Sequence, residues 1–408
     1  MSMTLERFHS LRIVMYETKL KDVTILGASG SIGSSAVAFL RLHRDKFSLK
    51  NIAVKSDWRA ALALCNEFGC TGVSIEDEGA ARSFIGHSIA ANVQLLHGPS
   101  GAAQLATDSV DVVLAAISGS EGLPSVLAAL RSRNNVALAN KEALVCGGPS
   151  LLALADSMSA KIIPVDSEHS AIYQSLLAGS HQEVESLLLT ASGGPFRTAT
   201  LGEMTQATPE AALNHPNWSM GVKNTIDSAT LANKGLELIE AAYLFGCNEA
   251  RIDVVINPSS VLHSAVCYQD GSMIAQLGRP DMRTAIGYGL SWPNRLPTGV
   301  EKLSLAKLRK LEFEEIDLNK FRPLSLARQA LRMGGDGSLI FNAANELAVS
   351  AFVDGRIRLT DIATLIDICL ERGIGRFCGS LDDIPLICEV AAEFCADQFA
   401  RVSDSLLR

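Results

Sequence analysis

Apolar runs rich in β-branched residues alternate with helix-like periodicity over residues 22–166. The runs that predict buried strands are Val23–Leu26, Asn51–Val54, Val110–Ile117, Asn135–Ala139 and Lys161–Val165. Between them lie helical segments such as Ser34–His43 and Gly122–Ser132. Strands that alternate with helices form a parallel sheet with helices on both faces. We therefore expect a Rossmann-like, doubly wound α/β domain at 22–166.

The pattern changes over residues 167–291, where strands and helices no longer alternate. Ser186–Ala191 and Arg251–Ile256 predict strands, and Ser264–Leu277 predicts a hairpin with an Asp-Gly turn. A polar loop at about 212–223 is followed by one predicted helix, Ser228–Phe245. These features indicate a mixed α+β domain that carries a flexible loop.

The last part of the chain shows only helical periodicity. Residues 292–322 contain prolines and lysines and predict a connector. Residues 323–408 form a third domain, whose expected helices are Leu324–Met333, Asn342–Phe352, Leu359–Glu371 and Ile384–Leu407.

Composition narrows the classes of function. The 408 residues are 48% hydrophobic and 20% charged, an ordinary globular balance that suits two or three domains. The net charge of −8 argues against a nucleic acid or an anionic membrane as partner, because both require a basic face. No apolar run approaches the roughly 18–20 residues of a membrane span.

Residues 1–21 are interpreted as an extension that precedes the first domain. They contain Glu6 and Glu17 and lack an apolar core with a small-residue cleavage site, so they predict neither a secretory signal nor a transit peptide. The nine cysteines lack zinc or disulfide spacing. We expect reduced thiols and a cytoplasmic location.

A glycine-rich string, GASGSIG at 27–33, directly follows the first predicted strand and opens a helix. Glycines let the backbone turn tightly and approach a pyrophosphate, which then lies at the helix N-terminus. A structural turn is the alternative. In this strand–loop–helix setting the string predicts dinucleotide binding, with Gly27, Ser29, Gly30, Ser31 and Ile32 as contacts.

The end of the next strand should face the adenosine ribose. There Asp57 favours the free 2′-hydroxyl of NAD, whereas Lys55 and Arg59 favour the 2′-phosphate of NADP. These residues leave both cofactors open.

Two carboxylates, Asp166 and Glu168, follow the last apolar run of the first domain. On an extended strand end they would point to the same side, where a shared divalent cation would let them coexist. Glu237 lies on the helix of the second domain, on one face with Asn233 and Glu240, and could supply a third oxygen. An all-carboxylate site favours Mg²⁺ or Mn²⁺. A plain helix N-terminus with favourable acids is the alternative for the first pair.

Several residues could bind a phosphate group. The turn Ser192-Gly193-Gly194-Pro195 follows a strand, and Ser228 begins the predicted helix, where backbone N–H groups point outward. Lys234 and His215 could complete the site, although each of these residues could equally be an ordinary turn or cap residue.

Apolar residues in the polar loop suggest a lid. Trp218 and Met220 lie between prolines and glycines, and a loop of this kind can close over a substrate and exclude water. Packing of the tryptophan into the core is the alternative.

These strings resemble the 1-deoxy-D-xylulose 5-phosphate reductoisomerase family. The resemblance lies in GASGSIG at 27–33, LANKEAL at 138–144, PVDSEHSAI at 164–172, TASGGPF at 190–196, HPNWSMG at 215–221, DSATLANKGLELIEA at 227–241, PSSVLHS at 258–264, LGRPDMRT at 277–284 and NAANE at 342–346. It implies an NADPH domain, a catalytic domain with a flexible loop and a C-terminal four-helix bundle, assembled as a homodimer. It also implies rearrangement of a phosphorylated sugar, 1-deoxy-D-xylulose 5-phosphate, and NADPH-dependent reduction to 2-C-methyl-D-erythritol 4-phosphate, a step of non-mevalonate isoprenoid precursor synthesis.

The resemblance also implies roles for individual residues. The implied metal ligands are Asp166, Glu168 and Glu237. Lys141 is implied as catalytic, and Lys141 and Ser167 would contact the reacting end of the substrate. The implied phosphate and lid residues are Ser192, His215, Trp218, Met220, Ser228, Asn233 and Lys234. The cofactor site would add Ser56, Arg59, Asn140, Glu142 and Gly221. Glu240, His263 and Glu142 are candidates for support of the site.

One stretch departs from the family pattern. Residues Lys55–Arg59 lack the small-basic-Asn pattern associated with the 2′-phosphate, which puts the cofactor preference in doubt but not the fold. Two other classes of protein remain as alternatives: a semialdehyde or homoserine type NAD(P)-dependent dehydrogenase, and a non-catalytic dinucleotide sensor. Neither has a use for three convergent carboxylates, and no cysteine lies in a semialdehyde dehydrogenase motif.

Overall fold

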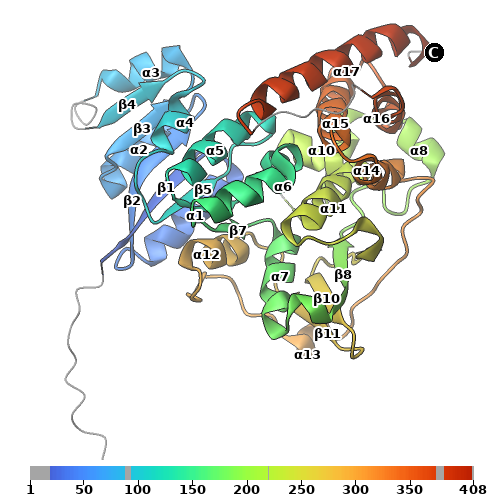
Figure 1. The fold of residues 1–408 in the computed structure, drawn as a ribbon, viewed down its shortest axis with the longest axis horizontal. Helices are drawn as coiled ribbons and strands as arrows, with labels where there is room; N and C mark the ends of the chain where they lie inside the picture. The colour runs from blue at the N-terminus through green and yellow to red at the C-terminus, as the bar shows by residue number, and fades with distance from the viewer. Residues whose placement is uncertain (1–18, 88–92, 219, 374–380, 407–408) are drawn as a thin grey trace, which may run out of the picture.

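A seven-stranded parallel sheet forms the N-terminal part of the computed structural model, which describes residues 19–87, 93–218, 220–373 and 381–406. The strand order is β4-β3-β2-β1-β5-β6-β7 (Figure 1). The strands are β1 Lys21–Leu26, β2 Phe47–Val54, β3 Gly72–Ile75, β4 Gln94–His97, β5 Val112–Ala115, β6 Asn135–Leu138 and β7 Ile162–Pro164. The Rossmann-like fold is therefore confirmed, although β3 and β4 were not expected.

Helices cover both faces of this sheet. They are α1 Ser31–Leu42, α2 Trp58–Phe68, α3 Glu78–Ile85, α4 Gly101–Leu105, α5 Leu123–Arg131 and α6 Lys141–Ser157. Phe39 of α1 and Leu64 of α2 belong to the core on one face, and Leu127 of α5 and Leu144 of α6 belong to the core on the other. The strand order reverses between β1 and β5, where open α/β sheets bind ligands beyond their carboxyl ends.

The glycine-rich string lies at this reversal, between β1 and α1. Gly27 has a φ of 88°, and a Cβ atom there would lie 2.5 Å from the carbonyl oxygen of Ala116, just beyond β5. A Cβ atom on Gly33 would lie 2.4 Å from the oxygen of Gly27. Only glycine allows the loop to turn this tightly against the neighbouring strand and against its own helix.

A four-stranded mixed sheet forms the second layer of structure, with the order β11-β10-β8-β9. The strands are β8 Val184–Ala191, β9 Ile252–Ile256, β10 Leu262–Tyr268 and β11 Met273–Leu277. The hairpin is confirmed, because β10 and β11 pair antiparallel, and Asp270 Oδ1 accepts a hydrogen bond of 2.8 Å from the backbone of Ser272 in the turn. Helix α7, Ser167–Ser175, leads from the first sheet to the second and packs against β10.

The single helix predicted for Ser228–Phe245 is wrong, because the structure has two helices there. Helix α10 spans Val222–Thr230 and α11 spans Ala232–Leu244. Between them Leu231 adopts a left-handed conformation with a φ of 58°, which interrupts the hydrogen-bond ladder. Ser228 therefore lies in the last turn of α10 and not at a helix N-terminus.

Helix α12, Arg283–Ser291, returns from the second sheet to the first. Its Ile286 and Leu290 belong to the same hydrophobic core as Phe39. A Cβ atom on Gly287 would lie 2.9 Å from the Phe39 ring, so the two helices approach closely. Lys21 at the start of β1 donates a 2.8 Å hydrogen bond to the carbonyl of Leu290. The remaining short helices are α8 Leu201–Thr205, α9 Pro209–Ala212 and α13 Leu305–Leu308.

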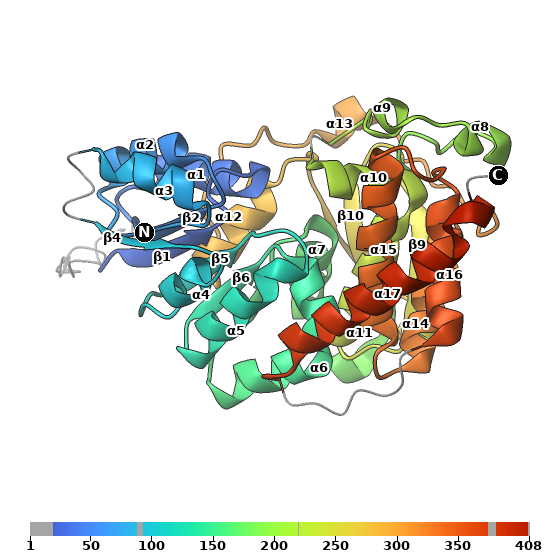
Figure 2. The same cartoon turned by 90° about the horizontal axis from the view of Figure 1, so that it is seen from above.

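Four helices follow the connector: α14 Arg322–Met333, α15 Gly337–Val353, α16 Asp361–Arg372 and α17 Ile384–Leu406. They pack together and against α11, and their core includes Leu236, Phe341 and Ile366. Helix α17 reaches from α16 back to α6, as Figure 2 shows, and its Ile384 and Ile387 join the core under α5 and α6.

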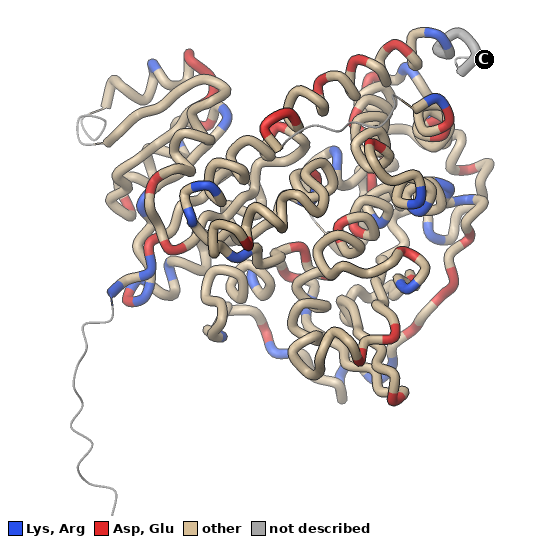
Figure 3. The backbone as a smooth tube through the Cα atoms, in the orientation of Figure 1, with Lys and Arg blue, Asp and Glu red and all other residues tan. Residues whose placement is uncertain are grey.

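Two further features of the described residues are the distribution of their charges and the character of their helices. Acidic and basic residues are interspersed along the described chain (Figure 3). Within the described ranges, no helix combines the length and the apolar character needed to cross a membrane.

The close approach of α11 to the C-terminal helices yields a test of the fold. A Cβ atom on Gly235 would lie 3.0 Å from Ala327 Cβ and 3.0 Å from the tip of the Phe341 ring. The substitution Gly235→Val should therefore lower the free energy of unfolding by about 1–3 kcal/mol, as overpacking does. Urea denaturation followed by circular dichroism measures the change.

The matched control is Gly202→Ala in α8, where a new Cβ atom would meet nothing closer than 3.9 Å. This variant should be as stable as the wild type or slightly more stable, because alanine favours helix. Equal destabilisation by the two substitutions would contradict the close packing at Gly235.

Candidate active site

A cavity of about 310 Å³ lies between the first sheet and the helix pair α10–α11. Its walls come from the α1 N-terminus, the loops after β6, β7 and β8, the 214–221 segment and both helices of the pair. The predicted site residues that line it are Ser31, Ile32, Lys141, Asp166, Ser167, Glu168, Ser192, His215, Trp218, Met220, Gly221, Ser228, Asn233, Lys234 and Glu237.

Three carboxylates converge at the bottom of this cavity. Carboxylate oxygens of Asp166, Glu168 and Glu237 lie within 4.8 Å of one another. Asp166 is the N-cap of α7 and accepts a 3.0 Å bond from the backbone of Ser167, so the first pair does not lie on an extended strand end as we predicted. A helix N-terminus nevertheless presents both acids to the cavity, as the alternative interpretation expected, and a shared cation stays a prediction.

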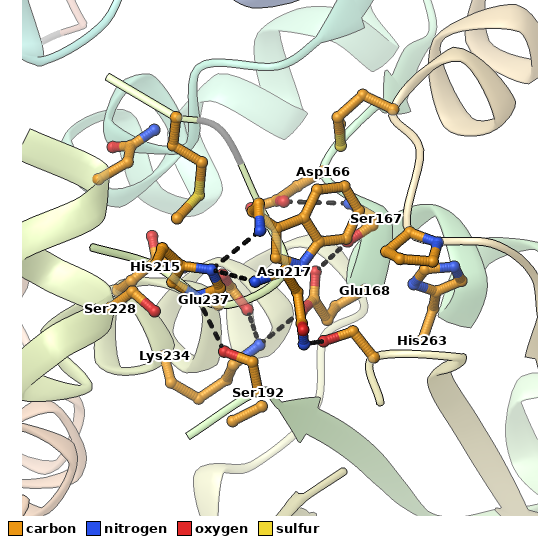
Figure 4. A pocket seen from close by; sticks show the side chains of 18 of the residues that line it. Asp166, Ser167, Glu168, Ser192, His215, Asn217, Ser228, Lys234, Glu237 and His263 are labelled. Atoms are coloured by element: carbon orange, nitrogen blue, oxygen red, sulfur yellow. Dashed lines mark hydrogen bonds and ion pairs between the residues drawn. The ribbon is translucent and has the colours of Figure 1, made fainter. Parts of the chain in front are cut away.

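Two buried lysines bind these carboxylates, and Figure 4 shows one of them, Lys234, beside Glu168 and Glu237. Lys141, the first residue of α6, places its Nζ 2.5 Å from Asp166 Oδ2 and 3.2 Å from Glu237 Oε1. Lys234 places its Nζ 2.8 Å from Glu168 Oε1 and also contacts Glu237 Oε2. Asn233 accepts a 2.9 Å bond from Lys141 and donates to Glu237, which confirms that residues 233 and 237 share a face of α11.

The environment moves the pKa values of two of these acids in opposite directions. Burial raises the pKa of Glu237, and the neighbouring Glu168 carboxylate adds to this effect. Burial also acts to raise the pKa of Asp166, but the adjacent Lys141 ammonium outweighs it, and the pKa falls to about 2. Asp166 is therefore the acid that stays ionised, whereas Glu237 protonates first as the pH falls.

The donor set fits a hard divalent cation. All three groups supply oxygen, and Asp166 Oδ2 is buried without a hydrogen-bond partner although it faces the Lys141 ammonium. Carboxylate oxygens without sulfur or imidazole favour Mg²⁺ or Mn²⁺ over Zn²⁺. Such a cation would also offset the repulsion that raises the pKa of Glu237.

A buried pair, His169 and Glu240, supports the carboxylates from behind. His169 Nε2 lies 2.8 Å from the backbone oxygen of Glu237, and Nδ1 lies 3.4 Å from Glu240 Oε2. Burial lowers the pKa of His169 and raises that of Glu240. A neutral imidazole therefore donates from Nε2 to the Glu237 carbonyl. His169 was not predicted as a site residue, although its place one turn after Asp166 was a usable signal.

The turn after β8 lies on the other side of the cavity. Ser192 Oγ accepts a 3.2 Å bond from the backbone of Gly194 and lies 3.1 Å from His215 Nε2. Gly194 has a φ of 64°, and a Cβ atom there would lie 2.5 Å from the Ser228 oxygen, so the turn and α10 touch directly. Ser192, His215 and Ser228 are thus brought together. Lys234 instead faces Glu168 and Glu237.

Residues 215–218 are fixed over the cavity by several hydrogen bonds. His215 Nδ1 accepts from the backbone of Asn217 and Trp218 at 3.1 and 2.9 Å, so its proton lies on Nε2 and points at Ser192. Asn217 Nδ2 donates to the Pro258 carbonyl and to Ser260 Oγ. The half-buried Trp218 ring lies 6.4 Å from the His263 ring. The tryptophan therefore covers the cavity without entering a hydrophobic core.

The predicted cofactor residues divide into two groups. Ser31, Ile32 and Gly221 line the cavity itself. The others lie outside it, at the glycine-rich loop or at the carboxyl ends of β2 and β6: Gly27, Ser29, Gly30, Ser56, Arg59, Asn140 and Glu142.

At the end of β2 the side chains have partners of their own. Asp57 is the N-cap of α2 and accepts a 3.0 Å hydrogen bond from the backbone of Ala60. The exposed guanidinium of Arg59 lies 4.5 Å from the centre of the Trp58 ring. The Asp57 carboxylate is thus engaged at the helix end, and Arg59 is the group that remains available to an anion.

Some residues that line the cavity were not selected from the sequence. They are Ser35, Ala139, Thr190, Ala191, Asn217, Asn224, Leu231, Ser260, Pro280, Asp281 and Met282, and His263, expected only as support, lines it as well. None of these residue types indicates a site by its chemistry alone. Most of them fall within the strings that carry the resemblance, which were their indication in the sequence.

Comparison with known proteins agrees with this geometry. Models of 1-deoxy-D-xylulose 5-phosphate reductoisomerase match residues 23–148, and its C-terminal domain models match 162–245 and 277–396. A relative of that name from Chlorobium chlorochromatii is 46% identical over 353 residues, 86% of this chain and 92% of its own length. One from Vesicomyosocius okutanii is 41% identical over 90% of this chain and 95% of its own length.

Solved structures give the same result. A DOX-P reductoisomerase in complex with NADPH, fosmidomycin and magnesium matches with a TM-score of 0.88 and 39% identity, over 93% of this chain and 98% of that one. The Zymomonas mobilis enzyme in complex with NADPH matches with a TM-score of 0.87 and 37% identity, over 93% and 99% of the two chains. Since family models, relatives and structures agree along nearly the whole fold, this chain belongs to the 1-deoxy-D-xylulose 5-phosphate reductoisomerase family.

Proposed function

We propose that this enzyme uses NADPH and Mg²⁺ or Mn²⁺ to convert 1-deoxy-D-xylulose 5-phosphate into 2-C-methyl-D-erythritol 4-phosphate. The observation that carries the proposal is the meeting of three carboxylates and the N-terminus of α1 in one cavity. A semialdehyde or homoserine dehydrogenase would have no use for this carboxylate set. The reaction requires a rearrangement of the carbon skeleton, most simply by retro-aldol cleavage and re-addition, and then reduction of the resulting aldehyde.

Asp166, Glu168 and Glu237 are the proposed metal ligands. A bound cation supplies the positive charge that stabilises the enediolate formed on cleavage. Lys141 lies beside these ligands with its ammonium buried, so it can contact the reacting oxygens once the cation takes over its carboxylate partners. Ser167, whose hydroxyl donates a 2.5 Å bond to Glu168, orients that ligand and can contact the same end of the substrate.

The opposite wall is the proposed phosphate site. Ser192 and His215 lie within hydrogen-bonding distance of each other, and Ser228 approaches the same turn. Asn233 and Lys234 lie in the first turn of α11, where backbone N–H groups have no partners within the helix. Lys234 pairs with Glu168 and Glu237 in this structure, and it would be free to pair with the phosphate if these carboxylates held a cation. Trp218 and Met220 would cover the substrate and exclude water.

The enzyme is proposed to act as a homodimer in the cytoplasm. Strand β11 is an edge strand, and its Met273 and Ile274 are 55% and 39% exposed, which is the kind of edge that a second copy can cover. All eight cysteines of the described ranges are free, in keeping with a reducing compartment.

Turnover assays test the function directly. Absorbance of NADPH should fall when substrate and Mg²⁺ are both present, and a chelator should abolish the change. Glu237→Gln should lower turnover by roughly 10²-fold or more, because a hard cation loses one anionic ligand while the side chain keeps its size. Wild-type turnover in this variant would remove Glu237 from the metal site.

The pH dependence of Mg²⁺ binding follows from the pKa shifts. Ligands must be ionised to bind the cation. Because the pKa of Glu237 is raised and that of Asp166 lies near 2, Mg²⁺ affinity measured by calorimetry should fall with falling pH as Glu237 takes up its proton. The dependence should be much weaker in Glu237→Gln.

A further prediction concerns Trp218, which covers the cavity. Trp218→Ala should raise the KM for the sugar phosphate by about tenfold, since loss of an apolar cover costs roughly 1–2 kcal/mol. The KM for NADPH should change much less, because the tryptophan ring faces His263 on the substrate side. Steady-state kinetics with each substrate varied in turn makes the comparison, and equal effects on both KM values would contradict it.

A separate prediction concerns the choice between NADPH and NADH. Arg59→Ala should raise the KM for NADPH by roughly tenfold and leave that for NADH unchanged, because a charged hydrogen bond contributes about 1.5–3 kcal/mol. Lys55→Ala is the matched control, since Lys55 already lies 3.6 Å from Glu121 and 3.9 Å from Glu76. A clear preference of the wild type for NADH would show that Asp57 dominates.

A further inference from the structure

Lys223 forms a buried ion-pair network beside the active site but outside its cavity. It lies in the first turn of α10, two residues after Gly221. Its Nζ is 2.8 Å from Glu142 Oε1 and 2.9 Å from Asp227 Oδ2. The side chains of Glu142 and Asp227 are only 4% and 0% exposed, so water cannot replace the lysine. None of the roles proposed above requires these buried ion pairs.

The residues of this network come from three helices of the fold, α6, α10 and α15. Glu142 lies in the first turn of α6, directly after β6 of the dinucleotide-binding sheet. Asp227 lies on α10 itself and accepts a second bond, of 2.8 Å, from Asn345 of α15. Glu346, the next residue of α15, accepts a 3.3 Å bond from the backbone of Ser120, which follows β5.

On the side of the dinucleotide-binding sheet, hydrogen bonds of Asn140 connect the network to the loop after β5. Asn140 caps α6 through a 2.5 Å bond from the Ala143 backbone and also donates to the carbonyl of Gly119. The first turn of α6 is thereby tied to the loop after β5, at the edge of the sheet that carries the glycine-rich loop. Any movement of this edge reaches Glu142 and, through its ion pair, Lys223.

On its other side the network adjoins the start of α10, which follows the residues that cover the cavity. Trp218 and Met220 line the cavity, and the chain enters α10 at Gly221. Gly221 has no side chain, and its carbonyl accepts a 2.9 Å hydrogen bond from Thr225 Oγ1 within the first turns of α10. Lys223 is therefore the first charged anchor after the cover.

Charge strengthens the connection. Burial acts to lower the pKa of Lys223, but Asp227 and Glu142 outweigh it and raise this pKa above its ordinary value. Burial likewise opposes ionisation of Glu142, and Lys223 outweighs it and lowers the pKa of that acid. Lys223 and Glu142 are thus both charged, and separation of such a buried pair leaves an uncompensated charge.

We propose that Lys223 is a positioning residue that couples binding of the nucleotide to binding of the sugar phosphate. The inference rests on the proposed function. Nucleotide at the glycine-rich loop fixes the edge of the sheet that holds Glu142, and the Lys223–Glu142 ion pair then fixes the point at which the segment with Trp218 and Met220 joins α10. Lys223 itself touches neither ligand.

The test measures a coupling factor rather than activity. The dissociation constant of 1-deoxy-D-xylulose 5-phosphate is measured by calorimetry with Mg²⁺, with and without saturating NADP⁺, which cannot supply hydride. For the wild type the ratio of the two constants should be roughly 5–150, the usual range for coupled sites. In Lys223→Met it should fall to about 1, and Lys223→Arg should restore most of it, because arginine keeps the charge.

Two further variants separate coupling from folding. Lys223→Met leaves both Glu142 and Asp227 buried without their lysine partner. Lys223→Met/Asp227→Asn keeps the net charge by removing one charge of each sign, and this variant should fold while still lacking the coupling. Glu142→Gln should lower the ratio as well, and its combination with Lys223→Met should lower it no further. Lys307→Met, which changes an exposed lysine on α13, is the matched control and should keep the wild-type ratio.

The outcomes are distinct. An unchanged ratio in the folded charge-neutral double variant would overturn the role of Lys223. Failure of the wild type to bind NADP⁺ or the sugar phosphate at all would instead overturn the proposed function.

Discussion

The crowding of three carboxylates around two ammonium groups, away from bulk water, is the constraint on which the rest of the site depends. Buried charges are tolerated only when they are paired, and Asp166 and Glu237 achieve this with Lys141 between them. Three anions and two cations leave an excess of negative charge. Burial acts to raise the pKa of both Asp166 and Glu237; the Lys141 ammonium outweighs it at Asp166 but not at Glu237. The proposed cation would offset the remaining negative charge.

The residues of this charged cluster come from two different parts of the fold. Asp166 and Glu168 come from the junction of β7 and α7, and Lys141 from the start of α6, all at the carboxyl edge of the first sheet. Glu237 and Lys234 come from α11 on the opposite side. The left-handed Leu231 breaks the helix, and residues on both sides of the break, Ser228 and Asn233, therefore line one cavity.

Much of the fold could be predicted from the sequence because its strands are continuous apolar runs. Strands β3 and β4 were missed because their sequences, GVSI and QLLH, each hold only two large apolar residues, and β4 is partly exposed at the sheet edge. The break at Leu231 has no local signal, since leucine rarely adopts a left-handed conformation and only tertiary packing can hold it there.

The candidate site divides in the same way. The carboxylates could be selected because paired acids in an apolar setting require a reason, and the glycine-rich loop because of its place after a strand. Asp57 was ambiguous, since an acid at a strand end can face a ribose or cap the next helix, and here it caps α2. The pairing of Lys223 with Glu142 joins residues 81 positions apart and could not be read from either string.

Helix α12 has a consequence for how the protein is made. Phe39 on the first sheet's helix α1 packs against Ile286 and Leu290, which are synthesised much later. The carbonyl that accepts the hydrogen bond of Lys21 likewise lies 269 residues further along the chain. A ribosome therefore releases most of the second sheet before the first is complete. The N-terminal sheet is early in sequence but late in maturation, and its nascent form must carry an exposed apolar face while the catalytic segments are still being synthesised.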